Sequence, residues 1–154
     1  MRQRWLAVGL LALGIFVINV IARVVTKQFE IVDAANQIKI ALVGMVAMGV
    51  LLIGAGAWWA VRHPFSRLFF DIGAAVLVGA LLSLILGPYA GGSEPFVEGL
   101  GAFVGQMLMF VGIAAVGVFL GFAAMVTLGK DWRSRRLARY ESAYNRRPRR
   151  PVRG

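Results

Sequence analysis

The sequence contains no cysteine, one histidine and only seven acidic residues among its 154 positions. Without cysteine, the chain can form no disulfide, thiolate metal site or thiol nucleophile. The single histidine, His63, cannot supply a zinc motif or the paired axial ligands of a membrane b-type haem. Ser83 and Ser93 have no neighbouring His or Lys that would activate them as nucleophiles. We therefore expect no catalytic residue, metal site or cofactor, although an isolated acid such as Asp71 could still act.

Charged residues are also scarce. They make up 16% of the chain, against 59% hydrophobic residues, whereas a soluble domain has about 25% charged and about 45–50% apolar residues. Long apolar runs occupy residues 5–22, 40–61, 69–87 and 100–128. Runs of about 20 residues can cross a bilayer as helices, and these runs lack the alternation of barrel strands. The sequence therefore predicts an all-α polytopic integral membrane protein, a bundle of four transmembrane helices.

The chain divides into a membrane domain and a tail. Residues 1–129 form the transmembrane domain, and residues 130–154 form a basic tail, in which we expect an amphipathic helix followed by a disordered segment. The predicted transmembrane helices cover about residues 5–25, 39–61, 66–87 and 97–129.

The first apolar run resembles a signal peptide because Arg2 and Arg4 precede it. However, it is longer than the usual stretch of about 7–15 residues. The nearest sequence that resembles a cleavage site, residues 32–34, lies well past its end. We therefore expect the first helix to be retained in the mature protein.

The distribution of basic residues predicts the orientation of the chain. Lys and Arg in short connections favour the cytoplasmic side, and indole rings favour the membrane interface. One set of helix ends carries Arg2, Arg4, Arg62, Arg67, the basic tail and all four Trp residues. The opposite ends carry Lys27, Glu30, Asp33, Glu94 and Glu98, with Arg23 and Lys39 weakening the contrast. We expect both termini to be cytoplasmic, in the plasma membrane.

Small residues at four-residue spacing mark faces along which membrane helices pack closely. The helix over residues 66–87 has such a stripe: Ala75, Gly79, Ser83 and Gly87. The helix over residues 97–129 has two G-x-x-x-G pairs: Gly101 with Gly105, and Gly117 with Gly121. We expect these two helices to cross tightly along the stripes, within one chain or between chains. The alternative is that glycine is simply frequent in membrane helices.

Two amides fall inside the predicted spans, where polar residues are costly and often functional. Asn19 and Gln106 lie at similar depths in the half of the membrane opposite the basic ends. The pattern favours a structural amide pair between the first and fourth spans. The alternative is a site for a polar substrate or an ion.

Two charged residues also lie within or near the spans. Arg23 is expected to reach the headgroup layer or to meet Glu98. Asp71 follows Arg67 by four residues, which favours an ion pair on one helix face. Proton coupling in a transporter is the alternative for Asp71.

The segment 87–99 is read as a loop with a helix start at its end. Pro95 suits the first turn of the fourth span, with Ser93 or Glu94 as its cap. Glu94 and Glu98 could together bind a cation, but no third ligand is apparent. Capping is therefore the favoured interpretation.

The tail beyond residue 129 holds nine Arg and one Lys against Asp131 and Glu141, a net charge of +8. An amphipathic basic helix typically lies in an anionic headgroup layer. We expect anionic lipid there, with an acidic protein partner as an alternative, and we do not expect nucleic acid. The predicted lipid or partner contacts are Trp132, Arg133, Arg135, Arg136, Arg139, Tyr140 and Tyr144.

Two functions remain open from the sequence. The first is a non-catalytic accessory, assembly or interaction subunit of a membrane complex, binding other membrane proteins or further copies of itself through its glycine faces. The second is a small transporter or channel protomer with a polar pathway near Asn19, Gln106 and Asp71. A bundle with a hydrated cavity around these polar groups would favour transport, and a dry, glycine-packed interior with outward apolar grooves would favour an interaction role.

Overall fold

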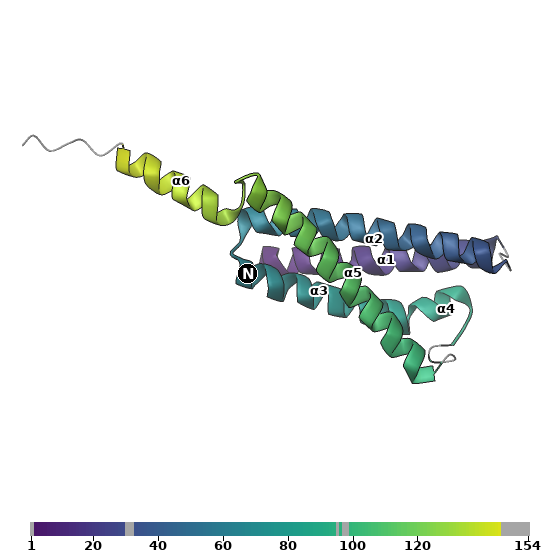
Figure 1. Ribbon diagram of the computed structural model, residues 1–154. Helices are drawn as coiled ribbons and strands as arrows, with labels where there is room; N and C mark the ends of the chain where they lie inside the picture. Colours follow the sequence, from purple (N-terminus) through teal and green to yellow (C-terminus); the bar gives the residue numbers. More distant parts are fainter. Residues whose placement is uncertain (1, 30–32, 95, 97–98, 146–154) are drawn as a thin grey trace, which may run out of the picture.

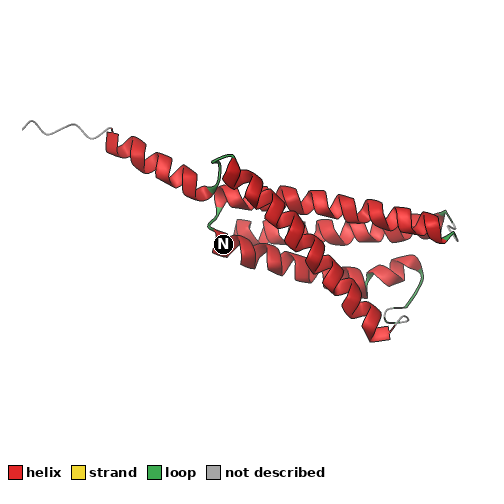
Figure 2. Cartoon of the chain, in the orientation of Figure 1, coloured by secondary structure: helices red, strands yellow, loops and turns green. Residues whose placement is uncertain are grey.

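The computed structural model describes residues 2–29, 33–94, 96 and 99–145. Within these ranges the chain is helical and contains no strand (Figure 2). The helices are α1 (Arg2–Gln28), α2 (Ala34–Arg62), α3 (Phe65–Ile85), α4 (Gly87–Gly91), α5 (Gly99–Thr127) and α6 (Trp132–Asn145). The helices α1, α2, α3 and α5 are long and apolar enough to cross a membrane. The predicted all-α bundle of four spans is therefore confirmed.

Figure 1 shows that the bundle has two distinct ends. At the α6 end lie the N-terminus of α1, the turn from α2 to α3 and the start of α6. At the α4 end lie the C-terminus of α1, the start of α2, the helix α4 and the start of α5.

Capping and proline geometry fix where the spans begin and end. The side chain of Asp33 accepts a hydrogen bond from the Ala35 amide at 3.2 Å and caps α2. The helix α2 stops at Arg62 because His63 takes an extended backbone before Pro64, as residues before proline tend to do. Pro64 then precedes the first residue of α3, so α2 and α3 are joined by a short turn and run antiparallel (Figure 1).

The segment after α3 differs from the predicted loop. The span ends at Ile85, and a short helix, α4, follows, with Pro88 in its first turn and Gly92 at φ 76° closing it. Ser93, which was predicted to cap the fourth span, instead donates its hydroxyl to the Pro88 carbonyl at 3.3 Å. Glu94 is exposed, and Pro95 and Glu98 lie outside the described residues.

Within the chain, the helices over 66–87 and 97–129 do not cross along their glycine stripes as predicted, and a crossing between chains stays a prediction. The most extensive contacts join α1 to α3 and α2 to α5. A Cβ atom built on Gly79 of α3 would lie 2.9 Å from the Ala12 carbonyl oxygen of α1. One built on Gly117 of α5 would lie 3.0 Å from Leu52 Cβ of α2. Each stripe therefore brings its helix close to a different neighbour from the one predicted.

The two glycine pairs of α5 have different surroundings. Gly117 and Gly121 are buried against α2, whereas Gly101 and Gly105 are exposed, and a Cβ atom on either would meet nothing within 4 Å. The oblique course of α5 across the bundle explains the difference (Figure 1). It is close to α2 at the α6 end and leaves it toward the α4 end.

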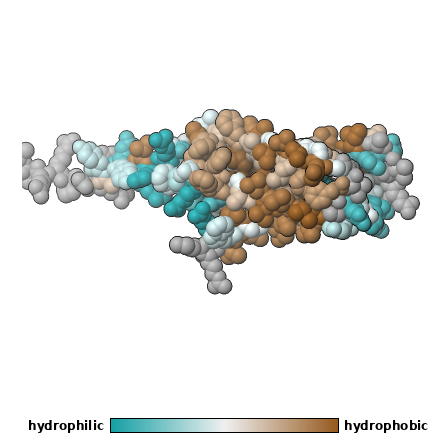
Figure 3. All heavy atoms as spheres, turned by 90° about the horizontal axis from the view of Figure 1, so that it is seen from below, coloured by the Kyte–Doolittle hydropathy of each residue, from teal (hydrophilic) through white to brown (hydrophobic). Residues whose placement is uncertain are grey.

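The interior of the bundle is closely packed, and its outer surface is apolar. Ile15, Leu52, Ala75, Ala80 and Ser83 are at most 1% exposed. Figure 3 shows a hydrophobic band around the spans, with hydrophilic residues at both ends. This pattern is typical of a chain that spans a bilayer.

The helix α6 extends away from the bundle, roughly along its long axis (Figure 1). The sequence predicted a helix that lies in the plane of the headgroup layer, and the structure does not place α6 in that plane. Its apolar side chains Leu137, Tyr140 and Tyr144 are all exposed. The segment predicted to be disordered, residues 146–154, falls outside the described residues.

Candidate functional site

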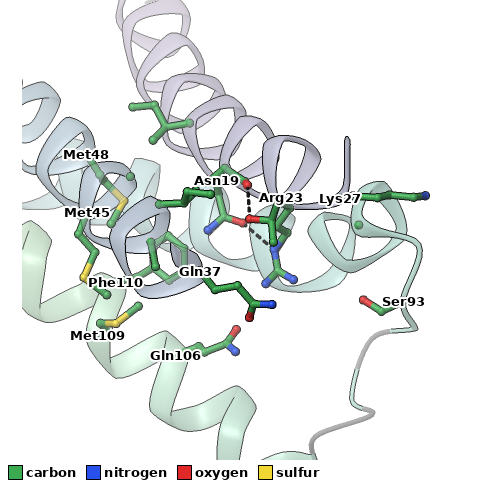
Figure 4. Close-up of a pocket in the computed structure, with 17 residues that line it drawn as sticks. Asn19, Arg23, Lys27, Gln37, Met45, Met48, Ser93, Gln106, Met109 and Phe110 are labelled. Atoms are coloured by element: carbon green, nitrogen blue, oxygen red, sulfur yellow. Dashed lines mark hydrogen bonds between the residues drawn. The ribbon is translucent and has the colours of Figure 1, made fainter. Parts of the chain in front are cut away.

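A cavity of about 470 Å³ lies between α1, α2, α4 and α5 at the α4 end. We call it the amide pocket. Figure 4 shows Gln37 and Gln106 pointing into the same space from α2 and α5, with Asn19 and Arg23 on the α1 wall. The polar side chains that line it are Asn19, Arg23, Thr26, Lys27, Gln37, Ser93 and Gln106, and its larger apolar ones are Ile18, Ile40, Met45, Met48, Met109 and Phe110.

Helix geometry explains why the pocket forms at this end. Near the α6 end, Gly56, Gly117 and Gly121 have no Cβ atom, which allows the backbones of α2 and α5 to come into contact. Helices are stiff, so two that cross at an angle separate beyond their contact. The separation between α2 and α5 at the α4 end is visible in Figure 1, and the amide pocket occupies it.

The predicted amide pair is replaced by a different contact. Asn19 Oδ1 accepts a hydrogen bond from Arg23 Nε at 3.1 Å, one helical turn along α1. Asn19 and Gln106 nevertheless line the same pocket, as their similar predicted depths implied. The proposed meeting of Arg23 with Glu98 lies outside the described residues.

Lys27, Gln37 and Ser93 were missed as pocket residues. Lys27 could have been found from its spacing, because Asn19, Arg23 and Lys27 recur every four residues on one face of α1. Gln37 was missed because the second span was predicted to begin at residue 39, whereas α2 begins at Ala34.

Asp71 lies near the α6 end, and its partner differs from the one predicted. The ion pair joins its Oδ1 to Arg4 of α1, and the expected partner Arg67 is exposed. Trp59 Nε1 donates a second hydrogen bond to Asp71 Oδ2 at 3.4 Å. Trp59 is only 5% exposed, so this indole packs inside the bundle, near the C-terminus of α2. Packing of α3 against α1 brings Arg4 within reach of Asp71, which sequence spacing cannot reveal.

A closely packed layer separates the amide pocket from the cluster formed by Arg4, Trp59 and Asp71. Gly79 of α3 lies against the α1 backbone and Ile15, and both Ile15 and Leu52 are at most 1% exposed in the core. Ser83 is fully buried and donates its hydroxyl to the Gly79 carbonyl at 2.8 Å. Asn19 and Gln106 therefore lie on one side of this packed layer and Asp71 lies on the other. The transporter hypothesis had placed all three along one polar pathway.

The base of α6 carries a strongly basic cavity of about 680 Å³. We call it the arginine groove. It is lined by Val61, Arg62, Trp132, Arg135, Arg136, Arg139, Tyr140 and Ala143, none of which is acidic. The Arg136 guanidinium lies 5.2 Å from the Trp132 ring centre and donates to Tyr140 Oη at 3.1 Å. The other predicted tail contacts, Arg133 and Tyr144, do not line the groove and carry exposed or partly exposed side chains.

Asp131 fixes the start of α6. Its carboxylate accepts hydrogen bonds from the Ser134 hydroxyl and, at 3.1 Å, from the Arg133 amide, which is the geometry of an N-cap. The Ser134 hydroxyl contributes most to a lowered pKa of the Asp131 carboxyl, and the Arg133 amide lowers it further. The cap is therefore ionised at neutral pH and is lost only when pH falls below the usual range of an aspartate.

Comparison with known proteins gives no relative. No protein-family model, curated protein or solved structure matches the chain.

Proposed function

We propose that this is a small non-catalytic integral membrane protein of the plasma membrane that acts as an accessory or assembly subunit of a membrane complex. Both termini would be cytoplasmic, since the basic tail and Arg62 and Arg67 lie at one end of the bundle.

The observation that carries this proposal is the uncovered glycine pair of α5. The helix α5 contains two G-x-x-x-G pairs. Of these four glycines, only Gly117 and Gly121 pack against another helix of the bundle. Gly101 and Gly105 leave open space on the outer surface. Lipid tails gain little from such a face, whereas a second helix gains close van der Waals contact there.

The basic end supports a role for anionic lipid in positioning the protein. Arg62, Arg135 and Arg139 line the arginine groove at the level of Trp58 and Trp132, two residues of a type enriched at membrane interfaces. Each basic residue near an anionic leaflet contributes roughly 1 kcal/mol of binding. The exposed apolar side chains of α6 would add contact with lipid or a partner.

A transporter or channel protomer is the second candidate, and the amide pocket is the observation that favours it. The packed layer below the pocket argues against it, because an ion or polar substrate would meet Ile15, Leu52 and Gly79 instead of further polar groups. Asp71, the acid suggested for proton coupling, is already paired with Arg4.

A leucine at position 105 tests the assembly role. Because a side chain there meets open space, Gly105→Leu should leave the bundle intact and remove close approach by a partner helix. We expect the complex extracted from native membranes to dissociate at least about fivefold more readily, equivalent to roughly 1 kcal/mol. The measurement is size-exclusion chromatography with light scattering in mild detergent.

Gly54→Leu is the matched control, because Gly54 is also exposed in α2 and has open space around it. It should leave the mass of the complex unchanged. A wild-type chain that elutes alone, or a Gly105→Leu variant that retains the full complex, would count against an assembly role through α5.

A further inference from the structure

The amide pocket has the chemistry of a binding site, apart from any role in assembly. Among the residues that the structure describes, its polar lining consists of a guanidinium, an ammonium, three amides and two hydroxyls, with no acidic side chain. Amides and hydroxyls can donate or accept, but Arg23 and Lys27 can only donate. A lining of this kind favours a ligand rich in acceptor oxygens and carrying negative charge.

The polar and apolar sides of the pocket lie at different depths. Lys27 is in the last turn of α1, and Gln37 is in the first turn of α2, so both are at the α4 end of the spans. Met45 and Met48 lie about 12 and 17 Å further along α2 than Gln37, at about 1.5 Å per residue. Figure 4 shows the same division, with the methionines and Phe110 gathered on one side.

The apolar side is closed at its base. Met48 and Phe110 are only 5% and 4% exposed, and the fully buried Leu52 follows one turn below Met48. Met109 is 40% exposed, so the wall on α5 is partly open toward the outer surface of the bundle. A ligand could therefore enter from the headgroup layer or from the side, but could not pass through.

We infer that the amide pocket binds one amphiphile with a phosphate headgroup, the phosphate lying beside Arg23 and the amides, with Lys27 at the mouth of the pocket, and the apolar chain lying against Met45, Met48 and Met109 (Figure 4). The cavity volume of about 470 Å³ is within the range of about 300–1,000 Å³ that is typical of small-molecule sites. It accommodates a headgroup and the first part of a chain. Glu94 lines an adjoining cavity of about 140 Å³, which shares Arg23, Ser93 and Gln106 with the amide pocket.

Three probes distinguish binding of a whole amphiphile from binding of a free anion or of an apolar chain alone. Decyl phosphate carries both the headgroup and the chain, inorganic phosphate carries only the anion, and decanol carries only the chain. Each is titrated against the full-length protein in maltoside micelles, and the rise in melting temperature is followed to saturation. We expect decyl phosphate to bind at least about tenfold more tightly than either of the others, because only it fills both sides of the pocket.

Matched variants place the binding in the pocket. Lys27→Gln should weaken decyl phosphate binding about fivefold, whereas Lys39→Gln, which removes an equal charge from the same end outside the pocket, should change it less than about twofold. Ala41→Phe should fill the pocket and abolish the shift, and Ala47→Phe should not. Both alanines are exposed on α2, and only Ala41 lines the pocket.

Several results would overturn the inference. One is the absence of a saturable shift with decyl phosphate. Others are equal binding of inorganic phosphate, equal binding of decanol, or full binding to the Ala41→Phe variant. None of these readouts depends on the mass of the complex, so this site and the assembly role can fail separately.

Discussion

Gly121→Ala should destabilise the bundle by about 1–3 kcal/mol, a large effect for the addition of one methyl group. A Cβ atom at this position would overlap the Ile53 carbonyl oxygen of α2 and would lie 2.8 Å from the Ala57 amide nitrogen. Both are backbone atoms, which no side-chain rotation can move. The helices α2 and α5 must therefore separate, and the neighbouring contacts of Gly117 must weaken with them. Unfolding in mixed micelles of SDS and maltoside measures the change.

Gly105→Ala is the control for this substitution. It adds the same methyl group to the same helix where nothing lies within 4 Å, so it should change stability by less than about 0.5 kcal/mol. Equal stabilities for the two variants would show that α2 and α5 do not pack through Gly121.

The ion pair between Arg4 and Asp71 gives the second large effect. Asp71 is 3% exposed and Arg4 is 45% exposed, so removal of Arg4 leaves this buried carboxylate, among the described residues, with only the Trp59 indole as a side-chain partner. Breaking a buried pair costs about 3–5 kcal/mol, and the exposure of Arg4 reduces this range. We expect Arg4→Met to cost about 2–3 kcal/mol in the same unfolding assay.

A double-mutant cycle isolates the interaction. Because a charge pair can be replaced by apolar groups at little cost, the double variant Arg4→Met/Asp71→Leu should be more stable than Arg4→Met alone. Arg67→Met is the matched control, since Arg67 is exposed one turn before Asp71, and we expect it to have almost no effect. If Arg67→Met costs as much as Arg4→Met, then the local pair on α3 is the one that forms.

The spans could be predicted because they follow from a local requirement. A helix must be long and apolar to cross a bilayer, and both properties can be read from a continuous segment. Which spans pack together could not be predicted in the same way. The stripe through Gly79 shows that α3 approaches another helix closely, and the sequence contains no information on its own about whether that helix is α1 or α5.

The same reasoning applies to the polar residues. Their depths could be estimated from helix rise, and Asn19 and Gln106, which were expected at similar depths, line one pocket. Their partners depend on side-chain direction and on helix pairing. Asn19 bonds within its own helix to Arg23, and Asp71 bonds to Arg4, which is 67 residues away in sequence. Local spacing agrees with the contact between Asn19 and Arg23, which are four residues apart, but it favoured Arg67 over Arg4 as the partner of Asp71.

Binding at one end without passage through the bundle is tested most directly by thiol accessibility, since the chain has no native cysteine. Single Asn19→Cys and Ser83→Cys variants in sealed vesicles would be exposed to a membrane-impermeant maleimide from each side in turn. Asn19 lines the amide pocket, and Ser83 is fully buried in the packed layer. We expect Asn19→Cys to react from the α4 side only, and Ser83→Cys to react from neither side until the protein is unfolded. Reaction of Ser83→Cys from both sides of the folded protein would contradict the account.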